Sequence, residues 1–142
     1  NLAADAAVTV AEMMPAVVGW NREPEYKLGK DALADPRVKV IVGDVTDVLR
    51  NSRREFDSII LDIDNGASGL SAASNSRLYK AVGLATIRSA LRPDGCLAIW
   101  SASDDPPFVQ VLCQSGFTVT VERARTHPGG GSWNAIFIGR VA

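Results

Sequence analysis

Four apolar runs in the chain each stop at acidic or hydroxyl-bearing residues, the residue types that could do chemistry at the end of a strand. The runs end at Glu12, at Asp44, at Asp62 and Asp64, and at Ser101, Ser103, Asp104 and Asp105. Runs rich in Val and Ile that do not alternate with polar residues are typical of parallel strands covered on both faces. Ligands of an open α/β sheet bind beyond the carboxyl ends of its strands. The sequence therefore predicts a pocket lined with acceptors, suited to a ligand rich in hydroxyls, amines and N–H groups.

Glu12 and Asp44 have positions that fit a nucleotide-like cofactor. The carboxylate of Glu12 could accept hydrogen bonds from both ribose hydroxyls, although a surface acid beside a helix start would give the same pattern. Asp44 follows Gly43 and could accept from an exocyclic amine such as that of adenine. Asp44 could equally cap the helix expected to begin near Val45, because Asp is favoured in that position. The two roles of Asp44 can coexist.

Asp62 and Asp64 lie two residues apart, so both carboxylates share one face while the chain stays extended. Two carboxylates placed close together raise one another's proton affinity, which suits a general base or a cation-binding pair. The alternative is a pair of loop acids that cap backbone groups or bind solvent. The Gly- and Ser-rich stretch at 65–75 follows them and is typical of a loop that covers a substrate.

Composition and charge argue against several classes of protein. The 142 residues carry 15 Lys and Arg against 16 Asp and Glu, and no basic stripe with interleaved aromatics occurs, so we expect no nucleic-acid partner. The two cysteines, Cys96 and Cys113, lack CxxC spacing, so we expect neither a disulfide framework nor a metal site. No apolar stretch approaches the roughly 20 residues needed to span a bilayer, and no signal-type start is present. We therefore expect a cytoplasmic protein without a membrane anchor.

The glycines of the chain do not favour a phosphate site. The triple glycine at Gly129–Gly131 precedes a strand rather than a helix, which favours a hairpin loop over a phosphate cradle. No GxGxxG opens a helix, which disfavours a nicotinamide dehydrogenase. His127 lies in the expected hairpin loop, and no carboxylate or nucleophile stands at a spacing from it that is typical of a catalytic site. We therefore assign it no chemistry.

The expected elements form βα units followed by an antiparallel tail, all in a single domain of residues 1–142. Strands are expected over 7–13, 38–42, 58–62 and 96–100, with a terminal hairpin of 117–125 and 134–141. Helices are expected over 15–21, 46–51, 76–91 and about 104–116. The inward-facing residues are expected to be Val17, Val18 and Trp20 on the first helix and Leu78, Val82, Ala85, Ile87 and Leu91 on the third.

A resemblance to a known family follows from five motifs taken together. The segments VAEMMP, VGDV, FDSIILDIDNG, LRPDGCLAIWS and the closing GFTV resemble, in order and spacing, the spermidine synthase-like branch of the class I S-adenosylmethionine-dependent methyltransferase fold. The resemblance covers nearly the whole chain from Val8 onward. It implies an α/β, Rossmann-like fold with a mostly parallel sheet and a C-terminal antiparallel hairpin, in a homodimer. The family's first strand and glycine-rich loop have no counterpart, so we interpret the chain as N-terminally truncated.

The resemblance also assigns roles to individual residues. Asp62 resembles the catalytic aspartate that receives the attacking amine of a polyamine, with Asp64 and Asn65 as substrate-binding neighbours. The residues implied to bind the cofactor are Glu12, Gly43, Asp44, Val45 and Asp62. The implied cofactor is decarboxylated S-adenosylmethionine or S-adenosylmethionine, with methylthioadenosine or S-adenosylhomocysteine as the product and no metal.

Three functions remain open from the sequence. The leading hypothesis is a transferase that moves an aminopropyl group from decarboxylated S-adenosylmethionine to a small polyamine. A small-molecule methyltransferase on the same fold is the second, because Asn65 stands where the synthases carry a further aspartate. The third is a noncatalytic binding or dimerisation module, which Asn65 and the absent glycine-rich loop support.

Overall fold

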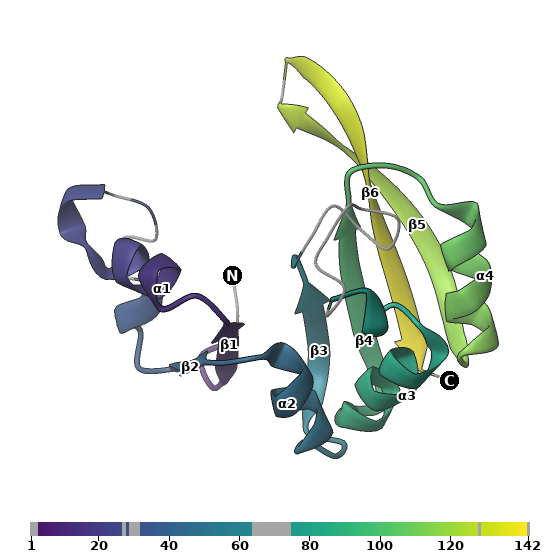
Figure 1. The fold of residues 1–142 in the computed structure, drawn as a ribbon, viewed down its shortest axis with the longest axis horizontal. Coiled ribbons are helices and arrows are strands. Elements are labelled where there is room, and N and C mark those ends of the chain that lie inside the picture. The colour runs from purple at the N-terminus through teal and green to yellow at the C-terminus, as the bar shows by residue number, and fades with distance from the viewer. Residues whose placement is uncertain (1–2, 27, 29–31, 64–74, 128, 142) are drawn as a thin grey trace. The chain divides into compact units, whose positions relative to one another are not determined.

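The computed structural model describes residues 3–26, 28, 32–63, 75–127 and 129–141 (Figure 1). The chain divides into two compact units, Asn1–Val48 and Leu49–Ala142, and each unit is described by itself. The boundary falls within the helix α2 (Val45–Arg50), whose residue Leu49 is buried. The single domain expected from the sequence stays a prediction.

The first unit is built on a parallel strand pair. Strands β1 (Val8–Glu12) and β2 (Val38–Val42) pair from Val8 with Val38 to Glu12 with Val42. The helix α1 (Pro15–Arg22) begins with proline in its first turn, where the missing N–H is no loss. Two short 3₁₀ turns, Pro24–Tyr26 and Ala32–Ala34, lie between α1 and β2. The two strands lie where the apolar runs predicted them.

One prediction about α1 is wrong. Val18 is buried as expected, but the Trp20 side chain is 51% exposed rather than facing inward. α1 is only eight residues long. An 8-residue helix makes little more than two turns, so it presents a narrow apolar stripe that Val18 occupies.

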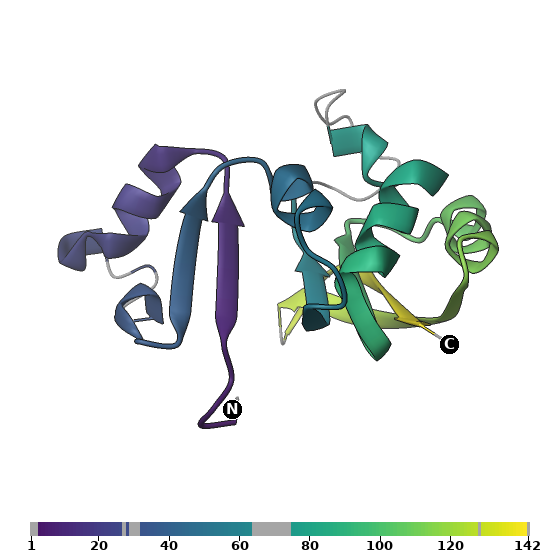
Figure 2. The same cartoon turned by 90° about the horizontal axis from the view of Figure 1, so that it is seen from below.

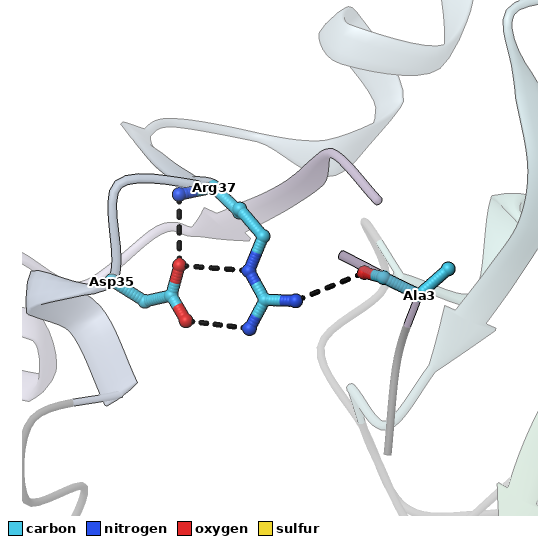
Figure 3. A network of polar contacts seen from close by, with 3 residues as sticks. All are labelled: Ala3, Asp35 and Arg37. Carbon is cyan, nitrogen blue, oxygen red and sulfur yellow. Dashed lines mark hydrogen bonds and ion pairs between the residues drawn. The ribbon is translucent and has the colours of Figure 1, made fainter. Parts of the chain in front are cut away.

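Arg37 ties the segment before β1 to the turn before β2 (Figure 3). Its Nε and Nη2 donate to the two carboxylate oxygens of Asp35 at 3.0 and 2.7 Å, and its Nη1 donates to the Ala3 carbonyl at 3.0 Å. The Arg37 carbonyl accepts from the N–H of Val8 at 2.9 Å. The hydrogen bonds from Arg37 lower the pKa of Asp35 to about 2. These contacts fix the start of β1 beside the start of β2.

The second unit contains a mixed four-stranded sheet in the order β3-β4-β6-β5. Its strands are β3 (Phe56–Leu61), β4 (Leu91–Ser101), β5 (Phe117–His127) and β6 (Gly130–Val141). β3 and β4 pair in parallel, whereas β6 pairs antiparallel with both β4 and β5. The expected α/β fold with parallel strands first and an antiparallel hairpin last is confirmed.

Two helices, α3 (Ala81–Ala90) and α4 (Pro106–Gln114), lie on the same face of this sheet (Figures 1 and 2). α4 begins at Asp105, whose carboxylate accepts from the N–H of Phe108 at 3.0 Å and caps the helix. The core between the helices and the sheet is formed by Ile59, Leu61, Leu84, Ile87, Leu97, Ile99, Phe108, Leu112, Phe117 and Phe137. Burial of these side chains holds the carboxyl ends of β3 and β4 in place.

The long helix expected over 76–91 is shorter than predicted. A 3₁₀ turn covers Asn75–Arg77, and a turn at Leu78 and Tyr79 followed by the extended residue Lys80 separates it from α3. The backbone of Gly83 lies against this turn so closely that a Cβ there would be 2.4 Å from the Arg77 carbonyl oxygen. Because α3 starts only at Ala81, its buried side is made by Leu84, Ile87 and Ala90. Val82, which was expected inside, is 81% exposed, and Ala85 is exposed too.

The β5–β6 hairpin extends beyond the end of β4 (Figure 1). β4 pairs with β6 only as far as Ser101 with Ala135, whereas β5 and β6 continue to pair as far as His127 with Gly130. In this extension the Arg125 guanidinium lies 4.7 Å from the centre of the Trp133 ring. Gly130 and Gly131 adopt positive φ values of 153° and 96° at the turn. The predicted terminal hairpin is confirmed, but its loop is shorter than expected, because β5 continues to His127 and β6 already begins at Gly130.

Candidate functional site

Glu12 and Asp44 lie at the same end of the first unit. Glu12 is the last residue of β1, and its register partner Val42 is the last residue of β2. The N–H of Gly43 donates to the carbonyl of Glu12 at 2.9 Å, so the chain leaving β2 passes directly beside Glu12. Asp44 is the next residue. The structure thus brings two of the predicted site residues to the carboxyl ends of neighbouring parallel strands.

The Glu12 side chain shapes the turn that leads into α1. Its Oε1 accepts from the N–H of Met14 at 2.7 Å, and among the described residues no backbone N–H donates to its second carboxylate oxygen. Met13 and Met14 follow with 57% and 56% of their side chains exposed, and Val42 at the end of β2 is 53% exposed. An acceptor flanked by exposed apolar side chains suits a ligand with hydroxyls on one edge and a flat apolar part on another.

The Asp44 side chain caps α2. Its Oδ1 accepts from the N–H of Thr46 at 2.7 Å, and its carbonyl accepts from the N–H groups of Asp47 and Val48 at 3.1 and 3.4 Å. The capping role that the sequence left open is confirmed. Val45 is the first residue of α2. Gly43 has open space where a Cβ would be, so no close approach of backbone atoms within the described residues requires glycine there.

Asp62 follows β3 in the second unit. The preceding residue, Leu61, is 1% exposed, whereas Asp62 itself is exposed. Its carboxylate makes no hydrogen bond or ion pair with any residue that the structure describes. Asp64 and Asn65 lie outside the described residues. How Asp62 lies relative to Glu12 and Asp44 stays a prediction, because the acids belong to different units.

The other acceptors of the second unit serve the fold. The hydroxyl of Ser101 donates to the carbonyl of Ser103 at 2.8 Å, which shapes the turn after β4. Asp104 forms an ion pair with Arg123 of β5, and Asp105 caps α4. Asp62 therefore differs from Asp104 and Asp105, because its carboxylate forms no hydrogen bond or ion pair that stabilises the described part of the fold.

The Asp104–Arg123 pair is not indicated by any pattern in the sequence. The two residues are 19 positions apart, and their contact depends on α4 returning the chain to β5. A cross-strand search would not have found it, because Asp104 lies in the loop after β4 and β6 separates β4 from β5 in the sheet. Within the described ranges, no three His, Cys, Asp or Glu side chains are grouped closely enough to hold a metal ion.

A curated relative aligns with most of the chain. Polyamine aminopropyltransferase 1 of Streptomyces coelicolor is 34% identical over 119 residues, which make up 82% of this chain. Over this stretch the chain is similar to a polyamine aminopropyltransferase. The chain spans only 21% of that relative's length. No protein-family model matches the chain.

Solved structures share the fold of this chain. Spermidine synthase from Thermotoga maritima superimposes with a TM-score of 0.71 at 16% identity, over 96% of this chain and 45% of the synthase. The N-methyltransferase NodS from Bradyrhizobium japonicum, in complex with S-adenosylhomocysteine, gives 0.62 at 16% identity, over 95% of this chain and 66% of NodS. The resemblance expected from the five motifs and the Rossmann-like methyltransferase fold are confirmed. Among the described residues, every helix is too short or too polar to cross a membrane.

Proposed function

We propose that the chain is the transferase part of an aminopropyltransferase, which moves an aminopropyl group from decarboxylated S-adenosylmethionine to a polyamine. The observation that carries the proposal is Asp62, an exposed carboxylate at the end of β3 that engages no described residue. The 34% identity to an aminopropyltransferase supports the choice of reaction. The chain covers about a fifth of that relative, so the activity of the whole protein is part of the proposal.

Asp62 suits the proton chemistry of this reaction. A primary alkylamine has a pKa of about 10 and is protonated at neutral pH, so it cannot attack until it loses a proton. A carboxylate at the end of β3 orients the ammonium by a charge-assisted hydrogen bond and accepts or relays its proton as the new bond forms. Orienting the nitrogen toward the reacting carbon further increases the rate over that of the uncatalysed reaction.

The donor would bind at the ends of β1 and β2. The free oxygen of Glu12 accepts from ribose hydroxyls, and the segment Gly43–Val45 lies beside it for the adenine. The exposed Met13, Met14 and Val42 fit an adenine ring, so the residues present suit the group. The donor supplies a propylamine group whose terminal carbon is bound to a sulfonium sulfur. Attack of the amine on this carbon forms a C–N bond, breaks the C–S bond and releases methylthioadenosine.

The remaining parts of the proposal rest on the resemblance. The acceptor is a small polyamine held by Asp62, Asp64 and Asn65, and the enzyme acts as a homodimer in the cytoplasm. Light scattering on the purified protein measures the oligomeric state, with twice the mass of the chain as the expected result.

A product assay with two donors tests the reaction. The protein is incubated with 1,4-diaminobutane and either decarboxylated S-adenosylmethionine or S-adenosylmethionine, and the amines are analysed by mass spectrometry. We expect an aminopropylated product from the first donor only. A methylated product from the second donor alone would identify a methyltransferase. No product from either donor would support the noncatalytic module.

A further inference from the structure

The face of the sheet opposite α3 and α4 carries an ordered set of side chains. Because strand partners share a face, Ile60 of β3, Ala98 of β4 and Ile138 of β6 lie side by side. Ile60 is 75% exposed, and Ala98 and Ile138 are half-buried. These three side chains make this face apolar close to the carboxyl ends of β3 and β4.

Trp100 stands in the next row of the same face. It pairs with Ile136 of β6 and is half-buried. Leu61, the last residue of β3, pairs with Ile99. Continuing this parallel register by one residue sets Asp62 beside Trp100, about 4.8 Å away in the direction across the strands. Asp62 and Trp100 therefore occupy neighbouring register positions at the end of the strand pair.

Trp100 differs from the other two tryptophans of the chain. The ring of Trp133 already has the Arg125 guanidinium over it at 4.7 Å. Trp20 belongs to α1 in the first unit and is 51% exposed. In the part of the chain that the structure describes, Trp133 is the tryptophan with a cation over its ring, which leaves the Trp100 ring available for a cation from a ligand.

We propose that Trp100 is a specificity-determining residue that binds the second ammonium of a diamine or polyamine. The inference rests on the proposed function. Asp62 takes the nitrogen that reacts, and the far nitrogen stays protonated and needs its own site. The face of an indole ring attracts an alkylammonium, most strongly where water is partly excluded. Ile60 and Ile136 lie beside the two residues and would contact the methylene spacer.

The experiment compares a diamine with a monoamine. Rates are measured for 1,4-diaminobutane and for butylamine, which lacks the second ammonium, with decarboxylated S-adenosylmethionine as the donor. Trp100→Leu should raise KM for the diamine and so lower its kcat/KM about tenfold, while kcat/KM for butylamine stays unchanged. The preference for the diamine over the monoamine should therefore fall. Trp100→Phe keeps a ring and should retain most of the preference. Trp133→Leu is the matched control and should retain all of it.

A binding measurement supports the kinetic one and does not depend on a stable Trp100 variant. In protein carrying Trp20→Phe and Trp133→Phe, the fluorescence of Trp100 should change saturably with 1,4-diaminobutane and less with butylamine. If the diamine reacts while the preference survives Trp100→Leu and Trp100→Phe, or while Trp100 fluorescence stays constant, the role of Trp100 is wrong and the proposed function stands. If neither amine reacts with the unaltered protein, both proposals are wrong.

Discussion

The N–H of Gly43 donates a hydrogen bond of 2.9 Å to the carbonyl of Glu12, and this bond closes the carboxyl end of the β1–β2 pair. It follows from the parallel register in which Glu12 faces Val42. The bond holds two candidate cofactor ligands, Glu12 and Asp44, at one end of the unit, where the chain turns into α1 and α2.

Replacement of Glu12 by Gln should weaken nucleoside binding. Gln keeps one acceptor and loses the charge, so we expect the affinity for methylthioadenosine to fall about tenfold or more, measured by isothermal titration calorimetry. Glu25→Gln, in an exposed turn of the same unit, makes the same change of charge and should leave the affinity unaltered. Equal losses in the two variants would mean that overall charge, rather than the position of Glu12, sets the affinity.

Two glycine substitutions should change stability in opposite directions. Gly83→Ala places a Cβ 2.4 Å from the Arg77 carbonyl oxygen and 2.5 Å from the Leu78 Cα, so backbone must move and we expect a loss of about 2 kcal/mol. Gly19→Ala lies inside α1 with nothing within 4 Å of the new Cβ and should add about 0.5–1 kcal/mol. Urea unfolding measures both. A stable Gly83→Ala protein would show that the turn before α3 is not held against the helix.

The Asp35–Arg37 pair should give stability that depends on pH. The folded pKa of Asp35 is lowered to about 2, so the unfolded chain binds its proton first as the pH falls. The contribution is fully present above about pH 4 to 5 and is lost progressively as the pH falls toward about 2. Its size should be small, because both groups are near the surface.

The comparison of two variants isolates this contribution. Asp35→Asn and Arg37→Gln should each melt at a lower temperature than the unaltered protein near pH 6, and the differences should shrink below about pH 3. NMR titration of the Asp35 carboxyl gives its pKa directly. Differences in melting temperature that stay constant from pH 6 to pH 2 would contradict this account.

The strands were predictable from the sequence because local composition decides them. The Val- and Ile-rich runs at 38–42 and 58–62 suit buried strands, and two acids that follow neighbouring parallel strands must share an edge. The placement of Glu12 beside Asp44 is the part of the candidate site that was foreseen in this way.

Other features could not be predicted because they depend on distant contacts. The exposure of Val82 follows from the break at Lys80, which is set by the packing of Gly83 on the turn before α3. The insertion of β6 between β4 and β5 and the pair of Asp104 with Arg123 need the tertiary fold. The meeting of Asp62 with Glu12 and Asp44 stays a prediction.

The measurement that tests the central claim most directly is the rate of aminopropyl transfer by Asp62→Asn. Asp57→Asn, on the same strand, is the control, since that exposed carboxylate pairs with Arg92 at 2.7 Å away from the proposed chemistry. Because Asp62 makes no hydrogen bond or ion pair with the described residues, its variant should keep the melting temperature. We predict that kcat falls about a hundredfold or more in Asp62→Asn and stays unchanged in Asp57→Asn. Full activity of a folded Asp62→Asn protein would contradict the account.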